Sequence, residues 1–286
     1  MRRSSPATPP SVRVGAPVTI AVVLASLAFA GSAPAHGGIH SVVPQNGSAA
    51  VKLRQCWMTV VFVPRPAPEL GRAFPRRPDL DQTFYGADPL LGVWAASCAR
   101  GRVAGKRVDR IVLSLVGVPV GLTASGAPPL ANFFAHALIR ADTNSRPLVA
   151  RLRRAGLPAR FAPAARFRHS RPGVVPFSGA LDIPGRYRLE VNAVAPDPTN
   201  PHRHSNRFSY RARTGSAARF GLATAPAFDR FCFPTAGGCT ALVAAPPGSA
   251  MANLLGGTSA TARVGFDHAR LARLGLSPLP RGTARR

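Results

Sequence analysis

The sequence predicts an α+β fold rich in β-structure: a curved, mostly antiparallel sheet covered by one short capped helix, followed by an irregular C-terminal part. Three observations lead to this prediction. Runs of β-branched and aromatic residues recur along the chain, the longest at 108–120. One segment carries helix-capping residues at both ends. After residue 214 the chain is rich in Ala, Gly and Pro and shows weak periodicity.

The strands follow one another with turn-rich segments between them. Pro119 indicates that the far end of the strand at 108–120 lies on an edge or at a bulge. Apolar and polar residues alternate within 186–195, which predicts one buried and one solvated face. The strands are expected at 57–63, 90–98, 108–120, 132–141, 164–169, 186–195 and 207–213.

The clearest helix follows the strand at 132–141. Asn144 or Ser145 is expected to cap its start, Gly156 fits the position just past its end, and Pro158 prevents continuation. Leu148 and Leu152 fall on one face, so this helix should pack against the sheet. A second short helix is expected from Asp267 to Leu274.

The first 35 residues resemble a secretory signal peptide. Arg2 and Arg3 give a positive start, 16–30 is almost wholly apolar, and Ala33-Pro34-Ala35 has the small-x-small form of a cleavage site. The apolar run of about fifteen residues is shorter than the roughly twenty that a membrane anchor needs. We therefore expect a secreted or extracytoplasmic protein with no transmembrane anchor after cleavage. The expected parts are a signal peptide at 1–35, a β-rich core domain at 36–214, and an irregular extension at 215–286 with a cysteine loop, a short helix and a basic tail.

Charge is the strongest compositional signal. The chain holds 37 Lys and Arg against 11 Asp and Glu, a net charge of +26. Such a protein attracts polyanions at long range, which makes an anionic cell-surface polymer or lipid a candidate partner. The alternative is a basic exported protein with no anionic partner. The bases are scattered and aromatic residues are few, and no nucleic-acid-binding motif is present. Sequence-specific nucleic-acid binding is therefore not expected.

The four cysteines form an even set, which predicts two disulfides in an oxidising compartment. Cys232 and Cys239 flank a Pro- and Gly-containing loop, which leaves Cys56 to pair with Cys98. Three connectivities remain open on the sequence alone. No C-x-x-C pair points to a thiolate metal site.

Two histidine groups are candidates for binding. Cleavage after Ala35 would give His36 a free α-amine beside its imidazole, a copper-chelating pair to which His40 could add a third nitrogen. His202 and His204 lie in the loop 196–206, where they could share a metal or an anionic ligand. The alternatives are an ordinary N-terminal histidine and a solvated, proline-stiffened loop. The remaining ligand-binding candidates are Asp197 in the same loop and His136, for which a packed or exposed histidine with no special role is the preferred alternative.

The opening Ser41-Val42-Val43-Pro44-Gln45-Asn46-Gly47-Ser48, with His36 before it, resembles the start of CopC-type copper-binding exported proteins. A starting histidine is also similar to that of lytic polysaccharide monooxygenases. The resemblance implies copper as a cofactor.

The order of elements over 55–195 resembles the acetoacetate decarboxylase-like β-fold. It rests on the strand at 57–63, the Pro-rich 66–78, the strands through Val120, and the capped helix ending in Ala155-Gly156-Leu157-Pro158. Decarboxylases of that family form a Schiff base through a lysine whose pKa is lowered. Lys52 and Lys106 are the lysines of this chain, and neither lies in a convincing buried strand. The resemblance therefore implies the shape without that chemistry.

No G-x-S-x-G elbow, phosphate-cradling glycine loop or paired-carboxylate pattern is present, which argues against catalysis. We expect an exported, disulfide-stapled binding or surface-associated module for a small apolar or anionic ligand. Its pocket is expected between the sheet and the helix at 145–155, with the His202 and His204 loop at the rim. The alternatives are an exported copper-binding protein using His36 and a decarboxylase-like enzyme with an altered active site.

Overall fold

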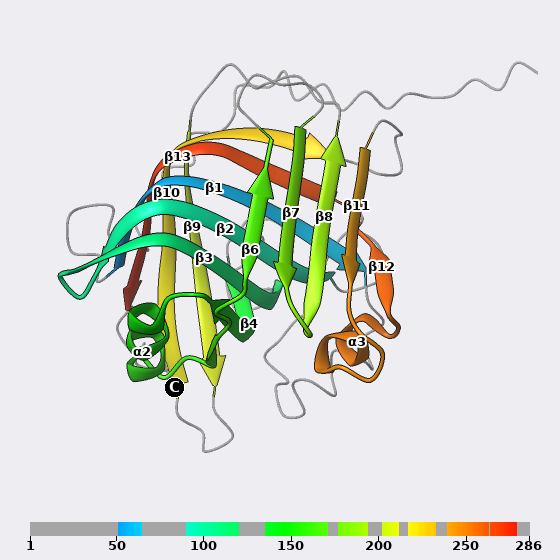
Figure 1. Cartoon of the computed structure of the whole chain (residues 1–286), viewed down its shortest axis with the longest axis horizontal. Coiled ribbons are helices and arrows are strands. Elements are labelled where there is room, and N and C mark those ends of the chain that lie inside the picture. The colour runs from blue at the N-terminus through cyan, green and yellow to red at the C-terminus, as the bar shows by residue number, and fades with distance from the viewer. Residues whose placement is uncertain are drawn as a thin grey trace, which may run out of the picture. The chain divides into compact units, whose positions relative to one another are not determined.

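The computed structural model describes residues 51–64, 90–119, 135–170, 177–193, 202–211, 217–232, 239–262 and 264–278. The described strands are β1 (Val51–Pro64), β2 (Leu90–Val103), β3 (Lys106–Pro119), β4 (Ala135–Thr143), β5 (Ala159–Phe161), β6 (Arg166–His169), β7 (Phe177–Ile183), β8 (Tyr187–Ala193), β9 (His202–Arg211), β10 (Ala217–Cys232), β11 (Cys239–Ala244), β12 (Ser259–Thr261) and β13 (Val264–Pro278). The described helices are α2 (Arg146–Arg154) and α3 (Ala250–Leu255). The predicted fold class, β-rich α+β with a curved and mostly antiparallel sheet, is confirmed (Figure 1).

The strands form a large and a small sheet. The large sheet has the order β3-β2-β1-β13-β10-β9-β4-β5, and β4 also pairs with β3, so the sheet curls back on itself. The small sheet has the order β12-β11-β8-β7-β6 and lies across the large one in Figure 1. A side chain on Gly179 of β7 would meet Thr59 Oγ1 of β1 at 2.6 Å, so the two sheets approach closely there.

Two apolar cores account for the alternation of side chains along the strands. The first lies inside the curl and includes Leu53, Met58, Trp94 and Leu138, together with Leu148 and Leu152 of α2. The second lies between the sheets and includes Val61, Val116, Leu189 and Val243, together with Leu255 of α3. Because both faces of the middle of β1 are covered, its residues read as a continuous apolar run.

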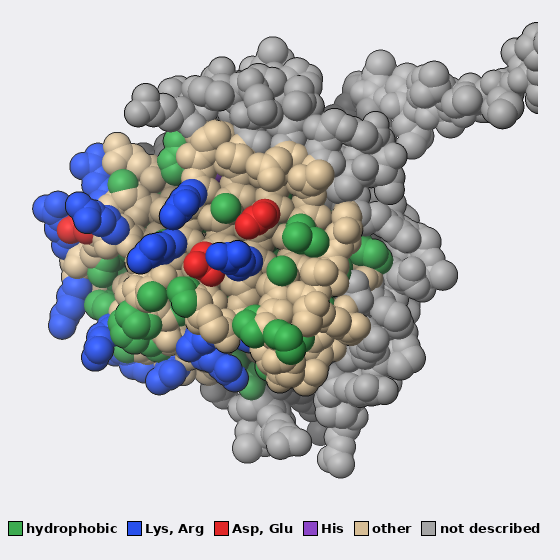
Figure 2. Space-filling model, turned by 45° about the vertical axis from the view of Figure 1, so that its right-hand side comes forward, with side chains coloured by type: hydrophobic (Ala, Val, Ile, Leu, Met, Phe, Trp, Pro, Cys, Tyr) green, Lys and Arg blue, Asp and Glu red, His purple; other side chains and the backbone are tan. Residues whose placement is uncertain are grey.

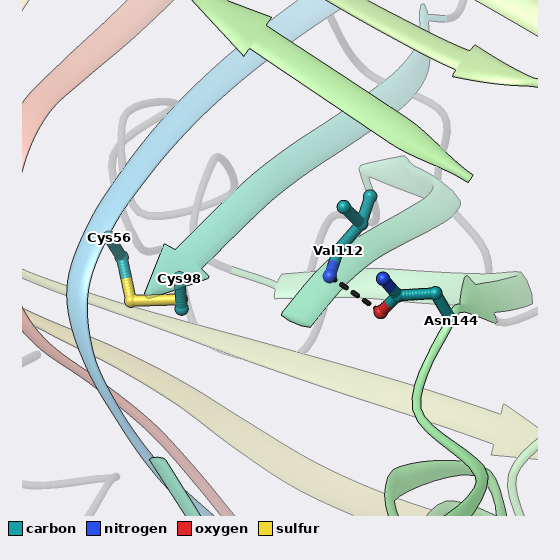
Figure 3. The surroundings of a disulfide bond; sticks show 4 residues. All are labelled: Cys56, Cys98, Val112 and Asn144. Atoms are coloured by element: carbon teal, nitrogen blue, oxygen red, sulfur yellow. Dashed lines mark hydrogen bonds between the residues drawn. A yellow bond between two sulfur atoms is a disulfide. The ribbon is translucent and has the colours of Figure 1, made fainter. Parts of the chain in front are cut away.

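The predicted helix is confirmed as α2. Ser145 is its N-cap and accepts a hydrogen bond from the Leu148 backbone N–H at 3.4 Å, and Gly156 follows the C-cap with a φ of 81°. Asn144 has a different role. Its amide Oδ1 accepts from the Val112 backbone N–H at 2.8 Å, and its Nδ2 donates to the Arg110 carbonyl at 2.9 Å, as Figure 3 shows for the first of these bonds.

One predicted disulfide is present. Cys56 of β1 and Cys98 of β2 are register partners and are bonded to each other (Figure 3). Cys232 ends β10 and Cys239 begins β11, and the residues between them lie outside the described part of the chain. A bond between this second pair stays a prediction.

The C-terminal region differs most from expectation. The expected helix from Asp267 to Leu274 is wrong, because this segment lies in β13 and pairs with β1 on one side and β10 on the other. The segment 215–286, expected to be irregular, supplies β10 and β13 to the large sheet and also forms α3, which has a Ser249 N-cap. Within the described residues, no helix is long and apolar enough to cross a membrane.

Candidate functional site

Five basic side chains lie together on the exposed face of one end of the large sheet. They come from three adjacent strands, and we call them the basic ladder: Lys52 and Arg54 of β1, Arg100 and Arg102 of β2, and Arg107 of β3. All five are exposed. Figure 2 shows basic side chains gathered at the left of the molecule, where the β2–β3 hairpin protrudes in Figure 1.

Strand register arranges the ladder in two rows. Arg102 stands opposite Lys52 on one side and Arg107 on the other, so three bases form the first row. Arg54 stands opposite Arg100 in the second row, and Asp109 lies beyond Arg100. Side chains directly opposite on antiparallel strands have Cβ atoms about 5 Å apart, and like charges in that position are destabilising.

Few carboxylates offset this charge. Arg107 pairs with Asp109 at 3.3 Å, and both side chains are largely exposed, so the pair contributes little. No carboxylate described in the structure lies within salt-bridge distance of Lys52, Arg54, Arg100 or Arg102. The ladder is thus a concentrated positive surface.

The alternation of buried and exposed side chains along β1 breaks at Gln55, between the ladder and the part of the strand that the small sheet covers. Gln55 has a φ of 53°, and the Cα register moves from Arg54↔Arg100 to Cys56↔Cys98 without an intervening pair. Beyond this point the Trp57 ring stacks on His169 of β6 with ring centroids 4.5 Å apart. The small sheet therefore covers β1 from Trp57 onward and leaves the ladder face open.

The ladder face carries no large apolar side chain in its described part. Apart from the ladder, the exposed residues in 52–55 and 99–110, on either face, are Gln55, Ala99, Ala104, Gly105, Lys106, Asp109 and Arg110. Insertion into the apolar part of a lipid layer normally uses large apolar or aromatic side chains. The face is therefore built for charge contacts and not for insertion.

A second polar group is buried between the sheets. Asp142 of β4 is fully buried and accepts hydrogen bonds from Arg140 Nε at 2.7 Å and from the Tyr187 hydroxyl at 3.1 Å, both on Oδ2. Arg186 Nη1 donates to Oδ1 of the same carboxylate. Ser114 Oγ lies 2.9 Å from the Tyr187 hydroxyl. We call Ser114, Arg140, Asp142, Arg186 and Tyr187 the Asp142 network.

A bulge in β4 creates this network. Val116 pairs with Arg140 and Gly117 pairs with Leu138, so Ile139 is the extra residue. Leu138 consequently faces the core inside the curl, whereas Arg140 and Asp142 face the small sheet. Burial raises the pKa of the Tyr187 hydroxyl far above its usual range, and the nearby Asp142 carboxylate raises it further. Tyr187 is therefore neutral in the folded protein.

A small depression lies on the outer face of the small sheet. Its volume is about 270 Å³, and its lining residues are Arg168, His169, Ser170, Ser178, Gly179, Ala180, Glu190 and Asn192. It contains a base and an acid in one cross-strand row, since Arg168 and Glu190 both stand opposite Ala180. Figure 2 likewise shows acidic side chains set among basic ones on this face. The mixed charge makes it a weaker anion site than the ladder.

The histidine candidates lie on β9, on β4 or outside the described residues. His202 and His204 lie in β9 and not in a loop, with backbones paired to Ala227 and Thr224, and their side chains lie outside the description. His136 is buried edge-on against Trp94, with ring centroids 4.4 Å apart. His36, His40 and Asp197 lie outside the described residues. Among the residues that were described, no three His, Cys, Asp or Glu side chains could hold a metal ion.

At the place where a pocket was expected, between the sheet and α2, the described side chains pack against one another. Leu148, Val149 and Leu152 of the helix are buried in the first core. Both lysines of the chain, Lys52 and Lys106, are exposed at the surface. Sequence reasoning missed the ladder, whose members are up to 55 positions apart. It also missed the Asp142 network, whose members come from β3, β4, β8 and the turn before β8.

Comparison with solved structures finds the acetoacetate decarboxylase-like fold that the order of elements had indicated. The fold is similar to that of the enduracididine biosynthesis enzyme MppR with HEPES buffer bound, with 13% identity, a TM-score of 0.49, and coverage of 80% of this chain and 85% of that one. It is also similar to an acetoacetate decarboxylase (10% identity, TM-score 0.47, 82% and 92% coverage). A further match is an acetoacetate decarboxylase-like enzyme from Sphingomonas wittichii RW1 (11% identity, TM-score 0.40, 80% and 94% coverage). These similarities concern the course of the chain and not its chemistry. No protein-family model and no curated protein matches the sequence.

Proposed function

We propose that this protein is an exported binding module that attaches to an anionic cell-surface polymer through the basic ladder. The observation that carries the proposal is the two-row arrangement itself. Five bases stand side by side on one exposed face, and Asp109 is the one described carboxylate that pairs with any of them. A polyanion that neutralises them removes the cross-strand repulsion and releases its condensed counterions.

The chemistry of the face favours a flexible polymer over a lipid surface. Neighbouring strands are about 4.8 Å apart and alternate residues on one strand about 6.8 Å apart, so the ladder presents a grid of charges. A flexible chain of phosphates or carboxylates can follow such a grid. The face has no large apolar side chain for insertion into lipid and no aromatic side chain for stacking bases.

Export is part of this proposal. The features that support it are the arginines, apolar run and small-x-small site within residues 1–35. A cell-surface polymer would be reached only by an exported protein. The Cys56–Cys98 bond is consistent with an oxidising compartment.

Two alternatives have less support. A Schiff-base decarboxylase needs a lysine with a lowered pKa, usually in a desolvated setting, whereas Lys52 and Lys106 are exposed. A small apolar ligand needs an apolar cavity, and in the described part of the curled sheet the interior is occupied by the side chains of the first core.

The test is a comparison of charge-matched variants. The full chain would be titrated with labelled long-chain polyphosphate, followed by fluorescence anisotropy. The ladder variant Arg54→Gln, Arg100→Gln, Arg102→Gln is expected to bind about tenfold or more weakly. The control Arg154→Gln, Arg160→Gln, Arg166→Gln removes three exposed charges from elsewhere and should change the affinity much less. Equal losses in both variants would show that net charge alone governs binding and would overturn the proposal.

A further inference from the structure

The Asp142 network is not electrically balanced. It contains two guanidinium groups, Arg140 and Arg186, and one carboxylate, Asp142, which is fully buried. Tyr187 is neutral and adds no negative charge. The other carboxylates whose side chains are described lie elsewhere: Asp109 pairs with Arg107, Asp182 lies 3.6 Å from Arg188, and Glu190 lines the outer depression. Counted over the described side chains, the network therefore carries a net charge of about one positive unit, and the partly exposed Arg186 shares it with solvent.

The hydrogen bonds of the network are also incomplete. Asp142 accepts three of them, from Arg140, Arg186 and Tyr187, and Arg186 Nη2 donates to the Phe161 carbonyl at 3.2 Å. Arg140 Nη2 is buried and has no hydrogen-bond partner. The whole Arg140 residue is only 6% exposed. Its guanidinium carbon lies 5.0 Å from the centre of the Tyr187 ring, and this contact offsets part of the charge without supplying an acceptor.

A buried donor without an acceptor is costly, and an acceptor that is itself an anion would also offset the surplus positive charge of the network. We infer that Arg140 Nη2 and the surrounding network bind a small monovalent anion between the two sheets. The anion accepts a hydrogen bond from Arg140 Nη2 and supplies the missing negative charge.

The surroundings restrict the size and the route of this anion. The neighbouring strands bury Val116, Tyr187 and Leu189 in the second core, so a halide fits the setting better than a polymer segment. Arg186 lies in the turn between β7 and β8, and its side chain is 30% exposed. It is the solvent-facing member of the network and gives the anion a charged entrance. This inference stands independently of the proposed function, because the ladder and the network share no residue.

The test uses bromide with the full chain at constant ionic strength. Bromide would replace gluconate, a much larger anion, and the thermal unfolding midpoint would be followed. A saturable rise of about 5 °C is expected, because a ligand that binds only the folded state stabilises it by mass action. The rise should be absent in Arg140→Met and retained in Arg160→Gln, a control at an exposed arginine. A wild-type midpoint that does not change, or changes without saturating, would overturn the inference.

Crystals of the wild-type chain grown in bromide give a second readout that does not depend on a variant folding. An anomalous peak within hydrogen-bond distance of Arg140 Nη2 is expected. A water at that position, or bromide at surface sites as an adventitious ion only, would contradict the inference.

Discussion

Arg54 and Arg100 stand directly opposite each other on β1 and β2, and the next paired residues along these strands are the bonded Cys56 and Cys98. Like charges in this position push the strands apart, whereas the disulfide holds them together. The covalent bond therefore lies where it can oppose the repulsion of the ladder.

Removal of the disulfide should destabilise the protein, most strongly at low salt. The sequence separation of 42 residues corresponds to a loop-closure contribution of about 4 kcal/mol. We expect Cys56→Ala with Cys98→Ala to lower the free energy of unfolding by about that amount, as measured by urea titration. The loss should be larger at 20 mM than at 500 mM salt, because salt screens the ladder. A loss of the same size at both salt concentrations would contradict the claim that the disulfide opposes repulsion within the ladder.

Asn144→Ala should loosen β3 near Arg110. The substitution removes two side-chain hydrogen bonds, one from the Val112 backbone N–H and one to the Arg110 carbonyl. An expected loss of about 1–3 kcal/mol in the free energy of unfolding follows from the backbone groups left without partners. Asn253→Ala, an exposed position on α3, is the matched control. Equal effects of the two substitutions would contradict the role assigned to Asn144.

Tyr187→Phe should change how stability depends on alkaline pH. Burial raises the pKa of Tyr187 in the folded state above its unfolded value, so its contribution is fully present below about pH 10 and is lost as the pH rises further. Between pH 9 and 11 the wild type should lose stability more steeply than Tyr187→Phe, by up to about 1.4 kcal/mol per pH unit. Urea titrations across this range, with Tyr210→Phe as control, would measure the difference. Parallel curves for wild type and Tyr187→Phe would show that Tyr187 ionises freely in the folded state.

Borohydride trapping with pyruvate or acetoacetate should leave the mass of the protein unchanged at neutral pH. Both lysines are exposed, and a Schiff-base lysine is usually activated by a desolvated or cationic setting. Intact-mass spectrometry would check this result. One stoichiometric adduct that disappears in Lys106→Arg or Lys52→Arg would restore the decarboxylase alternative.

The sequence predicted the elements whose formation depends on residues close together in the chain. The helix-capping residues around 145–156 located α2, and the β-branched run at 108–120 located most of β3. β13 was missed because Leu271 and Leu274, three positions apart, fit helical spacing, although Leu274 and Leu276, two positions apart, fit a strand. Pairing with β1 and β10, far away in sequence, decides between the two.

The ladder and the Asp142 network could not be predicted from residue spacing, because they depend on strand register and on a bulge. The alternation expected of an unbroken strand would place Leu138 and Asp142 on one face, and the bulge at Ile139 separates them. The bases of the ladder look scattered in sequence, and only the registers of β1, β2 and β3 bring them together.

The salt dependence of polyphosphate binding tests the central claim most directly. Each base that neutralises a phosphate contributes about −0.7 to −0.9 to the slope of log K against log salt concentration, so the five-base ladder predicts a slope of about −4. The slope of the ladder variant Arg54→Gln, Arg100→Gln, Arg102→Gln should be shallower by about 2, and the charge-matched control should keep the wild-type slope. Identical slopes for all three proteins would contradict the assignment of the ladder as the binding surface.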